Sequence, residues 1–272
     1  MPRTLVDDDG RLPSALGIMK HTTRMIWHHP ENHGVRARRM LRWAGWQAWE
    51  RTVGRPRTVH FHGRVRMVCH PHDHIGSLAM YCGLYDSEEM RFLLAWLRSG
   101  DTFLDVGANV APYSLLSTLV DGTRAIAFEP GSLARERAAE NITLNGVQDR
   151  VELVPHAVTD TAGSARLATD RWATNKLVGD DYAGDSETVE TVCIDSFVSD
   201  ESIEDVSLMK IDVEGRELEV LRGARELLDR DRPALIVENN QVDGLRSFAA
   251  RHGYTPVRYT PTTGALDEAG WP

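Results

Sequence analysis

Short apolar runs alternate with helix-like segments through the second half of the chain. Strands are predicted at residues 102–106, 125–128, 151–154, 207–211 and 234–237, and helices after Pro112 and at about 132–144, 215–229 and 241–252. This alternation is typical of a doubly wound α/β fold, in which a parallel sheet carries helices on both faces. Residues 162–192 interrupt it, because two short alternating pieces flank a polar loop at 170–187 that is either a lid or an exposed excursion.

The first third of the chain has a different pattern. Residues 58–69 alternate in the manner of a β-hairpin with Gly63 near its turn, and a helix is predicted at 87–97. A further helix is predicted at 35–53, where Met40 and three tryptophans recur near helical spacing with arginines between them. This stripe is expected to pack on the main domain or on a second subunit, which would give a homodimer. Binding at a membrane surface is the alternative.

Charge is distributed unevenly along the chain. The 272 residues have a formal net charge of −9, but residues 1–66 carry 13 basic and 5 acidic groups, and the remaining 206 residues carry 18 and 35. Because the larger part is acidic, a nucleic-acid substrate held on a broad basic face is disfavoured. We expect an N-terminal extension, residues 1–85, that supplies acceptor or subunit contacts, and a main domain, residues 86–272.

The three cysteines, Cys69, Cys82 and Cys193, include no C-x-x-C pair. They therefore provide neither a disulfide framework nor a zinc knuckle. No apolar run approaches the roughly 18 residues of a membrane span, and the first residues lack the layout of a signal peptide. The expected class is a cytoplasmic protein without a membrane span.

Ligands of a doubly wound sheet bind at the carboxyl ends of its strands. The residues at those ends are Asp105, Glu129, His156 with Ala157, Asp212 and Glu238. Most of them are acidic, which is unfavourable inside a protein unless a ligand or a metal compensates the charge.

The first strand and its turn indicate the kind of ligand. Glu129 ends the second strand, where an acidic side chain accepts hydrogen bonds from both hydroxyls of an adenosine ribose. Gly107 allows the backbone to approach a ligand closely, but the turn reads D-V-G-A-N-V-A and lacks the G-x-G-x-x-G set that binds a pyrophosphate. S-adenosylmethionine has a ribose and no phosphates, and it is the cofactor that this combination favours.

Several segments in fixed order resemble the FkbM-like family of S-adenosylmethionine-dependent methyltransferases. They read GLYDSEEM, FLDVGANV, AFEP followed by NITLNG, HAVTD, and LMKIDVEGRELEVLRGA followed by RPALIVEN, and the resemblance covers roughly residues 75–240. The resemblance implies a class I methyltransferase fold with a Rossmann-like sheet of seven strands, the last of them antiparallel. It also implies O-methylation of a small molecule, often at a sugar or polyketide hydroxyl; a methylated mannoside or a glycosylated natural product would fit.

The resemblance also assigns cofactor-binding residues. Asp105, Gly107 and Asn109 would line the methionine end, Glu129 of the Glu129-Pro130 pair would hold the ribose, and Ala157 with His156 would border the adenine. One position departs from the family, because Ala111 stands where its members commonly have a second glycine. Close contact of the cofactor with this turn is therefore in question.

A metal site is predicted at the ends of the fourth and fifth strands. Asp212 with Glu238 and Asn239 is similar to the acidic and amide set of metal-dependent catechol and macrolide-sugar methyltransferases. Such oxygen ligands suit Mg²⁺ or Mn²⁺, with the remaining positions filled by water and two adjacent substrate oxygens. The alternative is that Asp212 caps the following helix while Glu238 and Asn239 contact substrate or backbone groups without a metal.

The reaction expected of this arrangement is in-line attack of a hydroxyl on the sulfonium methyl group. A sugar hydroxyl is a poor acid, so a general base or a metal is needed. Besides Asp212, the catalytic candidates are Glu214 and the histidines His156, His72 and His74, and spacing does not choose among them. The alternatives to a small-molecule methyltransferase are an RNA methyltransferase and a non-catalytic binding protein on the same fold.

Overall fold

The computed structural model describes residues 15–170, 175–238 and 240–271. The chain forms two compact units that divide after Met90. The elements of the first unit are α1 (Ala15–His28), the 3-10 helix η1 (Pro30–Asn32), α2 (Arg36–Thr52), β1 (Arg57–His62), β2 (Val65–Cys69), α3 (His74–Cys82) and the first turn of α4 (Ser87–Trp96).

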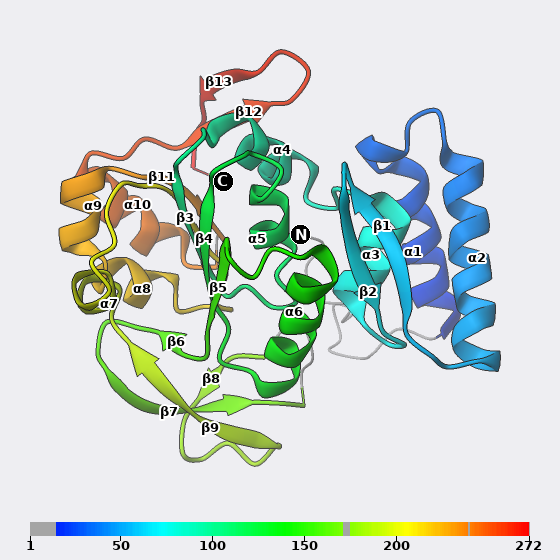
Figure 1. Cartoon of the computed structure of the whole chain (residues 1–272), viewed down its shortest axis with the longest axis horizontal. Helices are drawn as coiled ribbons and strands as arrows, with labels where there is room; N and C mark the ends of the chain where they lie inside the picture. The colour runs from blue at the N-terminus through cyan, green and yellow to red at the C-terminus, as the bar shows by residue number, and fades with distance from the viewer. Residues whose placement is uncertain (1–14, 171–174, 239, 272) are drawn as a thin grey trace. The chain divides into compact units, whose positions relative to one another are not determined.

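The second unit contains the remaining elements (Figure 1). Its strands are β3 (Thr102–Val106), β4 (Arg124–Phe128), β5 (Val151–Val154), β6 (Ala157–Val158), β7 (Gly163–Ala168), β8 (Leu177–Val178), β9 (Ser186–Val192), β10 (Val206–Ile211), β11 (Ala234–Val237), β12 (Val257–Thr260) and β13 (Ala265–Glu268). Its helices, besides the rest of α4, are α5 (Pro112–Ser117), α6 (Ser132–Asn145), α7 (Ile194–Asp200), α8 (Glu217–Arg222), α9 (Arg225–Asp231) and α10 (Val242–His252).

A five-stranded parallel sheet with the order β11-β10-β3-β4-β5 forms the centre of the second unit. Figure 1 shows α5 and α6 on one side of it and α8, α9 and α10 on the other. The middle strands are apolar on both faces, and Leu104, Ile126 and Ile211 have no exposed surface. Such two-sided burial is what a parallel sheet between helices requires, and the prediction of these five strands is confirmed.

The predicted number of strands is wrong. Within the described residues the main sheet has five strands rather than seven, and none of them is antiparallel. β12 and β13 pair only with each other, in an antiparallel hairpin. Val257 and Arg258 of β12 are exposed, as are Leu266, Asp267 and Glu268 of β13. These strands therefore lack the apolar faces that a place in the covered sheet would need.

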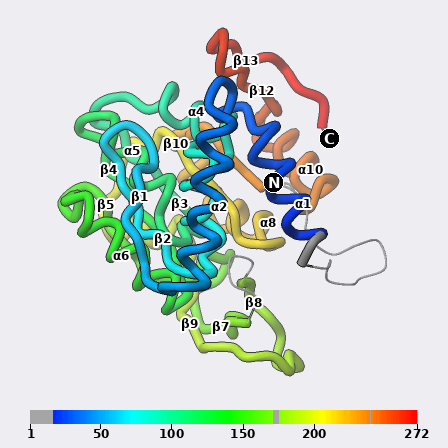
Figure 2. The backbone as a smooth tube through the Cα atoms, turned by 90° about the vertical axis from the view of Figure 1, so that its right-hand side faces the viewer, coloured from blue at the N-terminus to red at the C-terminus, as the bar shows by residue number. Residues whose placement is uncertain are grey.

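The segment that interrupts the alternation forms a second sheet, with the order β6-β9-β7-β8. In both Figure 1 and Figure 2 it lies at the end of the unit opposite the β12–β13 hairpin. Arg166 of β7 holds the connection between β8 and β9. Its guanidinium donates to the carbonyls of Gly179, Asp180 and Tyr182 and to the hydroxyl of Ser186. The described part of the polar loop is thus fastened to the small sheet.

The helix predicted at 215–229 is two helices, α8 and α9, separated at Gly223. A Cβ at this position would lie 2.5 Å from the carbonyl oxygen of Thr159 and 3.1 Å from Asp160 Cα. The backbone of residue 223 therefore packs directly on the turn after β6, and only glycine permits this approach.

The N-terminal unit buries the tryptophan stripe in a core of its own. Trp46 of α2 is 2 % exposed and packs with Ile26, Met80 and other apolar side chains, and the partly buried Trp43 and Trp49 lie against the same cluster. The predicted hairpin is confirmed as β1 and β2. The subunit interface predicted for this stripe remains a prediction. No helix in the described part of the chain is long and apolar enough to cross a membrane.

Candidate active site

The register of the main sheet brings the predicted site residues to one edge. The last residues of four strands are paired directly, Phe128 with Val106, Val106 with Ile211, and Ile211 with Val237. The residues that follow these strand ends are Gly107, Glu129, Asp212 and Glu238. Because the strands are parallel and end level with each other, the carboxyl edge gathers side chains that are far apart in the sequence.

Gly107 is required for contact between two of these strand ends. Its φ is +78°, and a Cβ placed on it would overlap the backbone carbonyl oxygen of Asp212. The amide groups of Gly107 and Ala108 both donate to the carbonyl of Phe128, at 3.1 and 3.0 Å. The glycine that we expected to make room for a ligand thus makes room for the backbone of Asp212.

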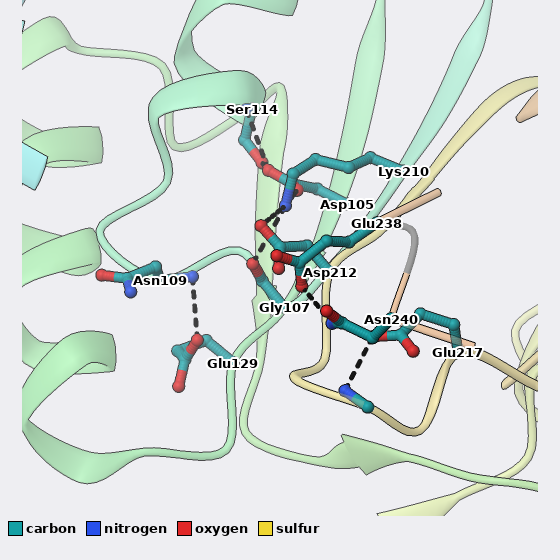
Figure 3. A network of polar contacts seen from close by, with 11 residues as sticks. Asp105, Gly107, Asn109, Ser114, Glu129, Lys210, Asp212, Glu217, Glu238 and Asn240 are labelled. Atoms are coloured by element: carbon teal, nitrogen blue, oxygen red, sulfur yellow. Dashed lines mark hydrogen bonds and ion pairs between the residues drawn. The ribbon is translucent and has the colours of Figure 1, made fainter. Parts of the chain in front are cut away.

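Lys210 is the central cation of the edge (Figure 3). It lies on β10, is 6 % exposed, and places Nζ 3.3 Å from Asp212 Oδ2, 3.8 Å from Asp105 Oδ1 and 3.3 Å from the carbonyl oxygen of Gly107. The ammonium also faces the ring of Tyr113, 5.0 Å from its centroid. One buried lysine therefore joins the ends of β3 and β10.

Asp105 points inward rather than toward solvent. Its side chain is completely buried, and Oδ2 accepts hydrogen bonds from the amide and hydroxyl of Ser114, at 3.1 and 2.6 Å. Burial raises the pKa of Asp105, while Lys210 and Ser114 oppose the shift. This carboxyl group fixes the first turns of α5 against β3, and Pro112 stands in that first turn, where the missing N–H has no cost.

Ala111 occupies a backbone conformation that favours glycine. Its φ is 64° and its ψ is 36°, and its side chain is fully buried at the start of α5. The left-handed backbone of this turn is one that favours glycine, the residue that the family commonly has at this position. Alanine adopts the same conformation here at a cost of about 1–2 kcal/mol.

Glu129 is held in place by two backbone amides. Oε2 accepts from Asn109 N at 2.8 Å and Oε1 accepts from Gly131 N at 2.8 Å, on either side of Pro130. The side chain is 9 % exposed, and burial raises its pKa to about 7 in spite of these two bonds. Each carboxylate oxygen keeps a lone pair beyond the one that its amide occupies. The geometry suits a carboxylate that accepts from two neighbouring hydroxyls.

Asp212, Glu214 and Glu238, here called the acidic trio, form a second carboxylate group on the edge. Each is half-buried, and one oxygen of each lies within 4.8 Å of the others. Burial raises the pKa of Glu238 to about 8, helped by the charge of Asp212 and by the hydrogen bond between the two. For Asp212, burial is outweighed by Lys210 and by that hydrogen bond, which hold its pKa below the usual range. Burial and the neighbouring carboxylates raise the pKa of Glu214 to about 7.

Two residues that the sequence analysis did not single out support the trio. Asn240 donates to Glu238 Oε2 at 2.7 Å and to Glu217 Oε1 at 3.3 Å (Figure 3). Glu217 is fully buried and also accepts from Gly215 N at 2.8 Å. Glu217 stands in a segment quoted for the family and Asn240 directly follows another, but nothing in their spacing indicates that they meet. Asn239, the third predicted metal ligand, lies outside the described residues.

Ala157 begins β6 of the small sheet, and His156 directly precedes it. His156 Nε2 lies 3.1 Å from Glu190 Oε2 on β9, and no hydrogen bond joins it to the acidic trio among the described residues. Ala157 is 5 % exposed and packs with Leu167 and Val189. The structure thus gives His156 a hydrogen-bond partner on β9, and it places Glu214, another predicted catalytic candidate, beside Asp212.

A known protein family matches the part of the chain that contains this edge. The family model described as "Methyltransferase FkbM domain" matches residues 105–256, which is more than half of the chain and includes every residue of the edge described above. Among curated proteins, no sequence matches the chain significantly.

Solved structures with low sequence identity are also similar. A methyltransferase FkbM from Methylobacillus flagellatus is 18 % identical with a TM-score of 0.43, over 71 % of this chain and 51 % of that one, so this chain spans about half of its length. A precorrin-6y C5,15-methyltransferase from Geobacter metallireducens is 15 % identical with a TM-score of 0.41, over 66 % and 82 %. The assignment rests on the family model and on the parallel sheet with its acidic edge: the chain belongs to the FkbM family of S-adenosylmethionine-dependent methyltransferases.

Proposed function

We propose that this protein is an O-methyltransferase that transfers the methyl group of S-adenosylmethionine to a hydroxyl of a small molecule, namely a sugar, an oligosaccharide or a glycosylated natural product. The observation that carries the proposal is the presence of two carboxylate groups on one edge of the sheet. Glu129 suits the ribose of the cofactor, and the acidic trio suits an acceptor rich in oxygen atoms.

The residues around Glu129 fit the cofactor. The two amides that orient the carboxylate leave lone pairs for the two ribose hydroxyls. Gly107 and Asn109 are proposed to line the methionine end, and Asp105 to act indirectly, by holding the start of α5. His156 and Ala157 are proposed to border the adenine. When bound, the cofactor supplies a methyl group on a positively charged sulfur, which the acidic edge favours electrostatically.

Asp212 and Glu238, with Asn239 as a further ligand, are proposed to hold a divalent metal such as Mg²⁺ or Mn²⁺ beside Glu214. The raised pKa values of Glu238 and Glu214 reflect carboxylates that are crowded together without enough positive charge, and hard oxygen ligands of this kind prefer these ions. A bound divalent cation would lower the pKa of an acceptor hydroxyl and orient two adjacent oxygens.

Glu214 is the proposed proton acceptor. Asp212 pairs with Lys210 at 3.3 Å and Glu238 accepts from Asn240 at 2.7 Å, whereas Glu214 has no hydrogen-bond donor among the described residues. Its φ of 56° places it in the turn between β10 and α8, where it is half-buried. Its oxygens are therefore the members of the trio most open to an acceptor hydroxyl.

A methyl-transfer assay tests the proposal. The protein is incubated with S-adenosylmethionine labelled in the methyl group and with mannose oligosaccharides, with and without a chelator, and fully O-methylated oligosaccharides serve as the control acceptor. We expect base-stable label in the free sugars, loss of label in chelator, and recovery with Mg²⁺ or Mn²⁺. Glu214→Gln is expected to lower the rate by about 10²-fold or more, and Asp267→Asn on exposed β13 to leave it unchanged.

Other results would contradict parts of the proposal. If the label enters RNA but no small molecule, the acceptor is RNA and the proposed acceptor class is wrong. Full activity in excess chelator would show that the reaction does not need a divalent metal. Binding of S-adenosylhomocysteine without transfer to any hydroxyl compound would favour a binding protein on this fold.

A further inference from the structure

Three arginines converge on a cavity that has no part in the proposed methyl transfer. The cavity has a volume of about 390 Å³ and lies among α8, α9 and α10. Both Figure 1 and Figure 2 show α8 and α10 close together in the second unit. Its polar lining includes Arg222, Arg225, Arg251, Ser247 and His252. In a unit with a large excess of acidic residues, such a concentration of positive charge requires an explanation.

The arginines of this cavity form no ion pair with a carboxylate among the described residues. Arg222 and Arg225 are exposed and make no ion pair or side-chain hydrogen bond in the described part of the chain. Arg251 donates from Nε to the carbonyl of Ser247 at 3.0 Å, which leaves its two terminal nitrogens for a ligand. Other arginines of the unit do have carboxylate partners, such as Arg124 with Glu152.

Two carboxylates in the neighbouring elements are engaged elsewhere, and Asp229 lies beside His252. Asp195 accepts from the amides of Glu226 and Leu227, at 3.1 and 3.0 Å, and Glu219 accepts from Arg216. The three guanidinium groups carry like charges around one cavity, and an anion bound between them would offset their mutual repulsion.

The remaining lining indicates more than an isolated anion. Phe248 is buried under the cavity and stacks on the ring of His252 at 4.2 Å, and Leu218 adds a second apolar side chain. His252 Nδ1 lies 3.8 Å from Asp229 Oδ1, so Nε2 is the ring nitrogen that can face a ligand. A site of a few hundred cubic ångströms with an apolar base and convergent polar groups is of the size that binds small molecules.

We propose that this cavity binds the phosphate group of a phosphorylated small molecule, with Arg222, Arg225 and Arg251 as its cationic ligands. Planar guanidinium groups match the oxygens of a phosphate in pairs, which an ammonium does not. The hydroxyl of Ser247 supplies a further donor, and Leu218 and Phe248 contact the organic part. The site is separate from the cofactor edge, although Leu218 directly follows Glu217, which bonds to Asn240 beside the acidic trio.

Binding measurements on the full chain at low ionic strength test the proposal. The probes are inorganic phosphate, glucose 6-phosphate and glucose, measured by calorimetry on protein saturated with S-adenosylhomocysteine, so that phosphate cannot report on the cofactor edge. We expect glucose 6-phosphate to bind more tightly than either inorganic phosphate or glucose. The double variant R222Q/R251Q is expected to lose at least tenfold in affinity.

Arg246→Gln is the matched control, because Arg246 is an exposed arginine of α10 that does not line the cavity. It should bind both phosphate probes like the parent protein, and the melting temperatures of all variants should agree. Equal affinities in the parent and the double variant, or no binding of either phosphate probe, would overturn the site. Binding of inorganic phosphate but not of glucose 6-phosphate would overturn the assignment to a phosphorylated small molecule. If the double variant no longer binds the phosphate probes but still binds S-adenosylhomocysteine, the phosphate site is separate from the cofactor site.

Discussion

Gly107 and Asp212 are in backbone contact so close that a side chain on residue 107 would overlap the carbonyl oxygen of residue 212. This contact joins the turn after β3 to the end of β10, on which the candidate metal ligand stands. Residue 107 must therefore be glycine for two reasons: its φ is positive, and there is no space for a Cβ.

Gly107→Ala is expected to lower the free energy of unfolding by about 2–5 kcal/mol, because overpacking adds to the left-handed strain. Urea denaturation measures the change. Gly146→Ala is the matched control, since Gly146 has a φ of +64° and a Cβ added there would meet nothing within 4 Å. That variant should lose only about 1 kcal/mol, from strain alone. Equal losses in both variants would show that the contact with Asp212 is unimportant.

Lys210 offers a test by a double-mutant cycle. Lys210→Met leaves Asp212 without its cation and should lower the free energy of unfolding by about 3 kcal/mol, as is usual when one partner of a buried pair is removed. With Asp212→Asn already present, the same change should cost about 1–3 kcal/mol less. Denaturation in chelator gives all four values. Strict additivity would mean that the ion pair contributes no coupling.

Much of this edge could be predicted from the sequence, and the reason is the register. Asp105, Glu129, Asp212 and Glu238 each stand at the end of an apolar run, and parallel strands that end level bring such residues together. Contacts that join distant segments through side chains have no such signal. The pairing of Glu217 with Asn240 depends on how α8 begins after a turn, which no periodicity encodes.

The strand count could not be predicted for a similar reason. The alternation around Val257 is compatible with a strand in the main sheet. The sheet that a strand joins is decided by the strand it pairs with, and β12 pairs with β13. The helix break at Gly223 likewise depends on the backbone at Thr159, which lies far away in the sequence. Local pattern indicates that an element exists, and packing decides where it joins the fold.

Glu129 predicts how stability depends on pH. Its pKa is about 7 in the folded protein and 4.5 in an exposed glutamate, so the folded state holds the proton more tightly. The free energy of unfolding of the cofactor-free protein should therefore decrease as pH rises from about 4.5 to 7, by an amount on the order of 3 kcal/mol for this group. Glu129→Gln removes the contribution, and denaturation of both proteins across this range isolates it.

Cofactor binding should show the opposite trend. Ribose hydroxyls donate more strongly to an ionised carboxylate, so S-adenosylhomocysteine should bind several-fold more tightly above pH 7 than below it. Calorimetry with the parent protein and Glu129→Gln measures this difference. An identical pH profile in the two proteins would contradict the role of Glu129.

Ala111 predicts a stabilising substitution. Ala111→Gly relieves about 1–2 kcal/mol of left-handed strain and loses about 0.4–1 kcal/mol through the greater entropy of the unfolded chain. A net gain of roughly 0.5–1 kcal/mol is expected in urea denaturation. Ala111→Val should be destabilising, because a β-branched residue fits neither this φ nor the buried site. A loss of stability in Ala111→Gly would contradict the strain.

The acidic trio predicts a trade-off between stability and metal binding. In chelator, Glu238→Gln should be at least as stable as the parent protein, because one of three crowded carboxylates becomes neutral. With saturating Mn²⁺ the parent should melt at a higher temperature and Glu238→Gln should not, since a ligand that binds only the folded state stabilises it. Asp267→Asn controls for surface charge. If Mn²⁺ raises the melting temperature of all three proteins equally, the ion does not bind at the acidic trio.

The pairing of β3 with β10 has a consequence for how the protein folds. Lys210 and the Gly107 carbonyl that it reaches are separated by 103 positions, and the whole small sheet lies in the sequence between them. Contacts across such a distance form slowly, because the loop must be closed before it is stabilised. Methyltransferase activity should accordingly be regained last during refolding, after the helices and hairpins have formed, and a chain released before residue 234 would have the cofactor turn but no complete acidic edge.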